Sequence, residues 1–259
     1  MSRIRKFLDY IIHSELISTT LTLVTFGFYC VVLGVSLLPS FYMLYYSMNW
    51  LLMGVTFPKA LLFCFTLPAA AYAFFVTAAI VFGMIERLIT WGIKPGKYPP
   101  ASLTFVRWLI NGGLHTVALN TFLPFVQGTA IYKMFLRICG CKIGKDVFIN
   151  TKSLHDVYLL TLHDGVVIGG ATDITCHLFE NGMIVLDYIE IGKGTLIGAS
   201  CRIGPGIHIG EDCTIGINSY VRRGRKIEDG SVLISLPALP IRYAMKLMNI
   251  KEKPSSKEQ

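Results

Sequence analysis

Charge is scarce in this chain. Only 15% of its 259 residues are Asp, Glu, Lys or Arg, and 53% are hydrophobic. Soluble domains usually carry about 25% charged residues. The shortage excludes a disordered protein and an ordinary soluble one, and it predicts that part of the chain lies in a membrane. The length allows one or two domains.

Acidic residues are scarcer than basic ones, which gives a net charge of +8. Seven of these eight net charges lie before residue 138, and residues 101–137 contain no acid at all. Most of the basic excess is therefore in or beside the apolar half of the chain. This distribution favours contact with an anionic membrane surface and argues against a nucleic-acid partner.

Several common motifs are missing. There is no Cys-x-x-Cys pair and the seven cysteines are odd in number, which predicts free thiols in a reducing cytoplasm. No Gly-x-x-x-x-Gly-Lys-Ser/Thr phosphate loop occurs. The first apolar run is too long for the core of a signal peptide and no small-residue cleavage site follows it.

Two long uncharged runs, 16–38 and 60–85, are each sufficient to cross a hydrocarbon core of about 30 Å. The aromatic segment 41–57 between them is also uncharged and is an alternative third span. Basic residues flank both sides of the region, and the positive-inside rule then requires an even number of spans. We therefore predict a transmembrane hairpin over 1–100, with segment 41–57 at the far interface.

Residues 101–138 mix apolar and basic side chains and contain Gly112, Gly113, Pro124 and Gly128. We expect these four residues to break the segment into short amphipathic helices that lie in the membrane interface. A packed helical linker is the alternative.

A six-residue period begins at Ile191 and predicts a solenoid. Each sextet supplies a short strand and a turn, and three sextets make one coil. The step from Ile149 to Leu162 implies a one-residue insertion, and the step of 17 from Ile174 to Ile191 breaks the register. An aliphatic residue occupies nine successive sixth positions: Ile191, Ile197, Ile203, Ile209, Ile215, Val221, Ile227, Leu233 and Leu239.

These sextets, over about residues 139–242, resemble the hexapeptide repeats of left-handed parallel β-helix acyltransferases. Segment 235–240 resembles the segment that closes such helices, with Leu236 at the usual Gly position. The resemblance implies the fold class: a helical membrane part followed by an all-β left-handed parallel β-helix. It also implies a homotrimer with sites between subunits, and acyl-CoA or a carrier-protein thioester as donor.

A more specific resemblance covers Gly128-Thr129, the run 135–144 (Phe-Leu-Arg-Ile-Cys-Gly-Cys-Lys-Ile-Gly) and the run 176–182 (Cys-His-Leu-Phe-Glu-Asn-Gly). With the preceding spans, these runs look like the membrane-bound C-terminal region of polylysine-type nonribosomal peptide synthetases. Those enzymes are thought to join aminoacyl groups to amines. Because this chain has no adenylation or carrier domain, the resemblance implies a separate adenylation/carrier partner.

His177 opens the segment where the register breaks. A histidine there is suited to take a proton from an amine or hydroxyl that attacks a thioester. Hexapeptide acyltransferases commonly use one such histidine, and Glu180 is the candidate to orient it. We further assign His155, Asp156, His163, Asp173 and Cys176 to substrate binding; Cys176 is also an alternative nucleophile.

A basic cluster, Arg222, Arg223, Arg225 and Lys226, interrupts the sextets and is the candidate phosphate-binding group. A solvated turn, or contact with anionic lipid, is the alternative. The zinc-binding histidine pair of γ-class carbonic anhydrases, five residues apart, has no counterpart here, so we expect no metal.

We therefore expect a membrane-anchored acyltransferase that transfers an acyl or aminoacyl group from a thioester to an amine or hydroxyl. It would be a multi-pass protein of the plasma (inner) membrane with its β-helix in the cytoplasm. A scaffold or partner subunit without catalysis and a γ-carbonic-anhydrase-like metalloenzyme are the alternatives. The tail 243–259 is predicted to be helical or disordered.

Overall fold

The computed structural model describes residues 15–100, 102–234 and 239–240. These divide into a helical unit, which includes Lys97–Gly140 and Phe179–Ile184, and a repeat unit, which includes Cys141–Leu178 and the residues from Val185 onward. The basic flank before the first apolar run and the predicted tail 243–259 lie outside the described residues.

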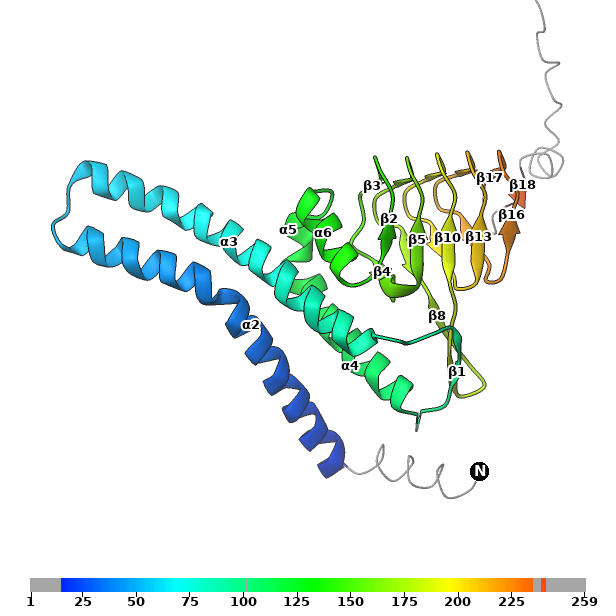
Figure 1. The fold of residues 1–259 in the computed structure, drawn as a ribbon, viewed down its shortest axis with the longest axis horizontal. Helices are drawn as coiled ribbons and strands as arrows, with labels where there is room; N and C mark the ends of the chain where they lie inside the picture. The colour runs from blue at the N-terminus through cyan, green and yellow to red at the C-terminus, as the bar shows by residue number, and fades with distance from the viewer. Residues whose placement is uncertain (1–14, 101, 235–238, 241–259) are drawn as a thin grey trace, which may run out of the picture. The chain divides into compact units, whose positions relative to one another are not determined.

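Two long helices, α2 (Glu15–Leu52) and α3 (Phe57–Thr90), form an antiparallel hairpin (Figure 1). By length and composition, Thr22–Leu52 and Phe57–Thr90 are each sufficient to cross a membrane. Both helices extend beyond the predicted spans. Most of the aromatic segment 41–57 continues α2 to Leu52, so it is not a separate helix.

Small and polar residues line the contact between α2 and α3. Thr77 Oγ1 donates to the carbonyl of Ser36 at 2.7 Å, and Ser40 Oγ donates to the carbonyl of Ala70 at 2.7 Å. Small side chains and interhelical hydrogen bonds hold membrane helices together, because lipid tails offer no hydrophobic advantage. Pro39 lies inside α2, which bends part-way along its length in Figure 1.

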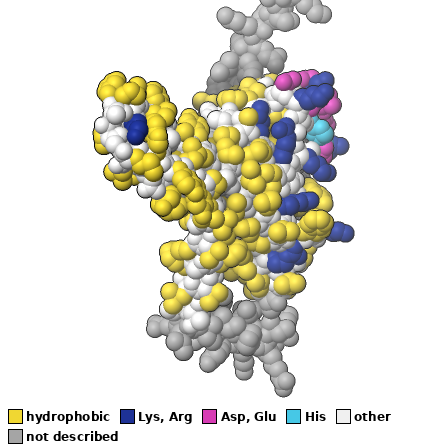
Figure 2. Space-filling view, turned by 60° about the vertical axis from the view of Figure 1, so that its left-hand side comes forward, with side chains coloured by type: hydrophobic (Ala, Val, Ile, Leu, Met, Phe, Trp, Pro, Cys, Tyr) yellow, Lys and Arg dark blue, Asp and Glu magenta, His cyan; other side chains and the backbone are white. Residues whose placement is uncertain are grey.

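Hydrophobic side chains cover the outer surface of this hairpin on the face that Figure 2 shows. Leu23, Phe26 and Val31 of α2 are each more than 60% exposed, as are Phe57 and Phe65 of α3. Apolar exposure on this scale is typical of a surface that lipid or another apolar partner covers.

Three shorter helices follow: α4 (Leu103–Thr121), α5 (Leu123–Val126) and α6 (Ala130–Ile138). The prediction that Gly112 and Gly113 break the first of them is wrong, because α4 continues through both. A side chain at Gly113 would collide with Tyr29 of α2, whose hydroxyl donates to the carbonyl of Ile110 at 3.2 Å. The glycine therefore serves close helix packing.

The repeat unit is a parallel β-solenoid of about five coils (Figure 1), which confirms the predicted β-helix class. Its strands form three sheets of five, six and four strands. The first contains β2 (Lys142–Ile143), β5 (Leu160–Leu162), β10 (Ile189–Ile191), β13 (Ile207–Ile209) and β16 (Lys226–Ile227). The second contains β3 (Phe148–Ile149), β6 (Val167–Ile168), β11 (Leu196–Ile197), β14 (Thr214–Ile215), β17 (Val232–Ile234) and β18 (Leu239–Pro240). The third contains β4 (Leu154–His155), β7 (Asp173–Thr175), β12 (Arg202–Ile203) and β15 (Tyr220–Val221).

The sextets form the coils as predicted. Ile191 pairs with Ile209 and Ile197 with Ile215, so that partners on neighbouring coils are 18 residues apart. The repeat aliphatics from Ile191 to Leu233 are at most 4% exposed, because each points into the core. Leu239 departs from the series: β18 pairs antiparallel with β17 and ends the parallel ladder.

Two irregularities interrupt the solenoid. Ile149 pairs with Ile168, a spacing of 19 that confirms the one-residue insertion, and a 3-10 turn, η1 (Val157–Leu159), lies in the inserted stretch. A β-hairpin, β8 (His177–Glu180) and β9 (Met183–Leu186), accounts for the break after Ile174. Its two turn residues both have positive φ, which suits a tight hairpin turn.

The helical unit also holds the tip of this hairpin. Phe179 lies against Phe105 and Trp108 of α4, with ring centroids 6.3 and 5.5 Å away. Nζ of Lys97, from β1 (Gly96–Tyr98), lies 3.6 Å from Glu180 Oε2. Aromatic packing and an ion pair thus hold the hairpin tip.

Candidate active site

His177 is the first residue of β8, where the chain leaves the regular coil. Its Nδ1 lies 2.5 Å from Oδ2 of Asp156 and 3.0 Å from Oγ1 of Thr175. The histidine side chain is 26% exposed, whereas that of Asp156 is only 5% exposed. A carboxylate only accepts hydrogen bonds, so Nδ1 carries the proton and Nε2 is the basic nitrogen of the neutral ring.

Asp156 reaches His177 because of the insertion in the preceding coil. Its backbone adopts the left-handed conformation, with φ of 55°, immediately before η1. Among non-glycine residues, Asp and Asn adopt this conformation most readily. The inserted residue and the inserted hairpin, on successive coils, thus bring an acid and a base together.

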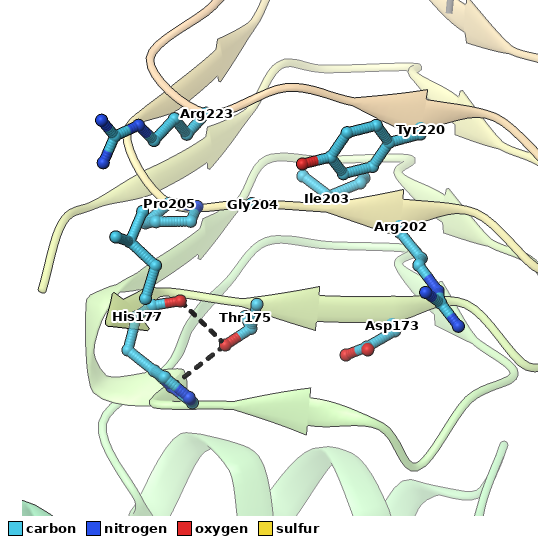
Figure 3. A pocket seen from close by; sticks show the side chains of 10 residues that line it. Asp173, Thr175, His177, Arg202, Ile203, Gly204, Pro205, Tyr220 and Arg223 are labelled. Atoms are coloured by element: carbon cyan, nitrogen blue, oxygen red, sulfur yellow. Dashed lines mark hydrogen bonds between the residues drawn. The ribbon is translucent and has the colours of Figure 1, made fainter. Parts of the chain in front are cut away.

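An open cavity of about 200 Å³ lies beside His177 (Figure 3). The outward-facing residues of the third sheet form much of its wall, since Ile174 and Ile203 point into the core while their neighbours point out. Gly204 contributes no side chain to this wall. The lining residues are Asp173, Thr175, His177, Leu178, Arg202, Ile203, Gly204, Pro205, Tyr220 and Arg223.

The acid in contact with His177 is Asp156 and not Glu180, the residue predicted to orient it. Glu180 belongs to the hairpin tip and pairs with Lys97. Asp156 was expected to bind substrate, but its buried carboxylate is engaged by His177 and does not line the cavity. The sequence feature that points to Asp156 is the one-residue insertion between Ile149 and Leu162, because Asp156 lies within that stretch.

The other residues that were predicted to bind substrate differ in their distance from the cavity. Asp173 lines the cavity. His155 lies near it, with Nε2 3.9 Å from Asp173 Oδ1 and its ring centroid 6.4 Å from that of His177. His163 does not line the cavity; its Nε2 lies 2.7 Å from Oε1 of Glu190 on another sheet.

Cys176, which was predicted to bind substrate, faces the core, is fully buried and does not line the cavity. Burial raises the pKa of its thiol well above the usual range, and the nearby carboxylate of Asp156 raises it further. A thiol of this kind stays protonated and is a poor nucleophile. The alternative of a cysteine nucleophile therefore has no support from its position.

Arg222, Arg223 and Arg225 lie between β15 and β16, and Lys226 begins β16. The cluster does not interrupt the coil, because His208 pairs with Lys226 at a spacing of 18. Arg223 lines the cavity beside His177, whereas its neighbours Arg222, Arg225 and Lys226 do not. The structure thus brings one of the four predicted phosphate-binding residues to the candidate site.

Arg202, Tyr220 and Thr175 line the cavity but were not singled out from the sequence. Their outward positions in the third sheet follow from the repeat phase: Arg202 pairs with Asp173 on one side and with Tyr220 on the other. The phase places Asp173, Arg202 and Tyr220 in one column, with Thr175 two residues further along β7, but periodicity alone does not show that a cavity forms beside them.

The helical unit contains a buried pair of titratable residues, one acid and one histidine. Glu86 of α3 is 2% exposed, and its two carboxylate oxygens lie 3.2 and 3.1 Å from Nδ1 of His115 on α4. Cys139 Sγ lies 3.5 Å from the same carboxylate. The contact with His115 offsets the free-energy cost of burying a charged carboxylate in an apolar interior.

Among the described residues, no group of three His, Cys, Asp or Glu side chains is arranged to hold a metal ion.

Residues 188–223 match the family model of the bacterial transferase hexapeptide (six repeats). Delta-poly-L-ornithine synthetase of Acinetobacter baumannii (strain AB307-0294) is 30% identical over 115 residues, which are 44% of this chain. The match spans only 8% of that relative's length.

Similar solved structures include a maltose O-acetyltransferase from Clostridium difficile 630. It is 17% identical, with 56% of this chain and 91% of that one covered and a TM-score of 0.43. A hexapeptide-repeat acetyltransferase from Vibrio cholerae O1 biovar eltor, complexed with acetyl coenzyme A, is 17% identical, with 60% and 97% covered and a TM-score of 0.44. The family match and the relative thus agree with the hexapeptide-repeat acyltransferase resemblance that the sextets predicted, over the part of the β-helix that they cover.

Proposed function

We propose that this protein is a membrane-anchored acyltransferase with His177 as its general base. It transfers an acyl or aminoacyl group from a thioester to an amine or hydroxyl. The observation that carries the proposal is the contact between His177 and the buried Asp156 beside an open cavity. The hexapeptide-repeat match supports acyl transfer as the class of reaction.

In the proposed reaction, Nε2 of His177 removes the proton from the acceptor as its nitrogen or oxygen attacks the thioester carbonyl. The carbon–sulfur bond then breaks, and the thiolate leaves with the proton that the imidazolium returns. Asp156 stabilises the imidazolium between these two steps and holds the ring in the productive tautomer. The acyl group ends on the acceptor and the donor ends as a free thiol.

The donor in this proposal is acyl-CoA or a carrier-protein thioester, the latter delivered by an adenylation/carrier partner. Both carry phosphate groups, for which the Arg223 guanidinium at the cavity is a suitable partner. The cavity is smaller than the 300–1,000 Å³ typical of ligand sites. We therefore propose that a second copy of the chain completes the site, in a homotrimer with sites between subunits.

The membrane part of the proposal rests on α2 and α3, whose length and apolar surface suit a bilayer. By the positive-inside rule, the basic flanks of the two apolar runs favour a hairpin with both ends on the cytoplasmic side of the plasma (inner) membrane. The β-helix is then cytoplasmic, where thioester donors are made.

The test uses the full chain in a neutral detergent. Acetyl-CoA and carrier-bound aminoacyl thioesters are offered with amine and hydroxyl acceptors, and acylated products are measured by mass spectrometry. A positioned general base contributes about 10²- to 10⁴-fold, so His177→Ala should lose at least about 100-fold. The matched control is His208→Ala, which removes an exposed histidine from another sheet.

Full turnover by His177→Ala would show that another group is the base. Absence of transfer with every donor would favour a scaffold over an enzyme.

A further inference from the structure

The tip of the hairpin formed by β8 and β9 presents an uncovered aromatic side chain. Phe179 lies against Phe105 and Trp108 of α4, yet it remains 60% exposed. The backbone also holds the hairpin, because β9 lies between β8 and β1 in a three-stranded sheet (Figure 1). The exposed position of this ring is therefore imposed by its neighbours.

The adjoining half of α4 exposes apolar side chains on one face. Leu103, Val106 and Leu109 follow one another at a spacing of three residues and are 74%, 44% and 51% exposed. A different face of α4 is already buried, through residues that include Leu114 and Ala118. A helix that is apolar on two faces needs an apolar partner for the second face.

These exposed side chains adjoin the hairpin tip. Phe105, which contacts Phe179, is one helical turn from Leu109, and residues four apart are neighbours on a helix surface. We call Leu103, Val106, Leu109 and Phe179 the tip patch. All four belong to the helical unit.

The charges around the tip patch indicate which apolar partner covers it. Residues 87–145 contain eight Lys and Arg residues and no Asp or Glu. Glu180, the acid at the hairpin tip, is paired with Lys97. The Arg87 guanidinium lies 5.8 Å from the centre of the Trp91 ring, and Trp91 is 67% exposed. Tryptophan beside basic residues is typical of the interface between water and an anionic membrane.

We propose that the tip patch lies in the lipid headgroup region of the leaflet in which α3 ends. The apolar surface of α3 continues to that end, since Met84 and Leu88 in its last two turns are 50% and 68% exposed. Interfacial helices bury their apolar face about 5–10 Å into the boundary between headgroups and acyl chains. The inference rests on the proposed membrane anchor and does not depend on acyl transfer.

The proposal has a consequence for the proposed base. His177 and Phe179 are two residues apart on β8, which is about 6.6 Å along the strand at 3.3 Å per residue. The strand that begins at the base therefore ends in the membrane interface, and an acceptor held at the membrane surface can meet the base there.

The experiment places single tryptophans in the full chain, reconstituted in lipid nanodiscs that contain anionic lipid. Trp50, Trp91 and Trp108 are replaced by Phe, which keeps an aromatic ring at each position. Phe179→Trp or Val106→Trp then introduces one indole into the tip patch. Lipids brominated near the headgroup end of their acyl chains quench an indole on contact. We expect them to lower the emission of both variants by about half or more, relative to unbrominated lipid.

Two further variants in the same background are the controls. Tyr188→Trp is matched in exposure, because Tyr188 is 56% exposed and lies between β9 and β10 in the repeat unit, and its emission should not change. Phe65→Trp introduces an indole at a 65% exposed position of α3 and tests the span itself, so its emission should be quenched.

The controls separate failure of this inference from failure of the proposed anchor. Quenching of Phe65→Trp without quenching of either tip-patch variant would overturn the inference and leave the anchor in place; the patch would then be covered by protein, such as a second copy of the chain. Equal quenching of Tyr188→Trp and Phe179→Trp would also overturn it. Absence of quenching in Phe65→Trp would reject the anchor and the inference together.

Discussion

Replacing Asp156 by Asn tests whether His177 works as one half of a pair. The carboxylate of Asp156 is 5% exposed and bonded to Nδ1 of His177. A hydrogen bond to a charged group contributes about 1.5–3 kcal/mol. Because each 1.36 kcal/mol is tenfold in rate, losing it when the imidazolium forms lowers kcat by about 10- to 150-fold. An Asn side-chain amide that donates to Nδ1 favours the tautomer with its proton on Nε2. That nitrogen can then no longer act as the base, which lowers kcat further.

The assay is the steady-state rate of donor-thiol release in detergent, with kcat and KM measured separately. Asn also adopts the left-handed conformation readily, so the backbone at position 156 should be retained. Asp164→Asn is the matched control, because Asp164 is exposed and its side chain caps a turn by accepting from the Lys145 N–H. We expect it to leave kcat unchanged.

The pair also predicts strong non-additivity. The double variant of His177→Ala and Asp156→Asn should be no slower than His177→Ala alone, since the acid acts only through the histidine. A normal kcat for Asp156→Asn, or two losses that multiply in the double variant, would refute the positioning role of Asp156.

Three further predictions concern stability and reactivity. His115→Ala leaves Glu86 buried without its partner and should lower the free energy of unfolding by about 3 kcal/mol or more, measured by thermal unfolding in detergent; an unchanged melting temperature would contradict this. The hydrogen bond from His163 lowers the pKa of Glu190 in the folded protein below its unfolded value of about 4.3. The ionised carboxylate therefore stabilises the fold slightly above about pH 4.3, and this stabilisation is lost as the pH falls through the lower folded pKa. The difference in melting temperature between wild type and Glu190→Gln should therefore shrink below about pH 4, and a difference that grows there would be inconsistent with the contact. The raised pKa and burial of the Cys176 thiol should protect it from iodoacetamide at pH 8 in the folded protein, as read by mass spectrometry; rapid labelling would place it at the surface.

The solenoid could be predicted because its sequence code is local. Each sextet places one aliphatic residue in the core, and neighbouring coils repeat that placement every 18 residues, as for Ile191 and Ile209. Where the spacing between core residues is not a multiple of six, such as the 17 residues from Ile174 to Ile191, the chain must leave the regular coil. His177, at the start of the hairpin, follows this break.

The partner of His177 could not be found in the same way. Glu180 is three residues away in the sequence, but it lies further along the strand toward the hairpin tip. Asp156 is 21 residues away and reaches His177 only because one coil stacks on the next with an inserted residue between them. Such a contact depends on three-dimensional register, which a repeat with irregular coils does not specify residue by residue.

The helical part shows the same limit. Glycine has low helix propensity, so Gly112 and Gly113 predicted a break. Packing overrides that preference, because Tyr29 of another helix occupies the space that a side chain at Gly113 would need. The buried pair of Glu86 and His115 likewise joins two helices and has no signature in either one.

The central claim is that acyl transfer occurs beside His177, and a structure of the protein with a non-reactive thioether analogue of acetyl-CoA tests it most directly. We predict the acyl carbon in the cavity lined by His177, Thr175 and Arg223, with room for an acceptor atom about 3–3.5 Å away and in reach of Nε2. An analogue bound with its acyl group at another face of the solenoid, remote from His177, would contradict the account.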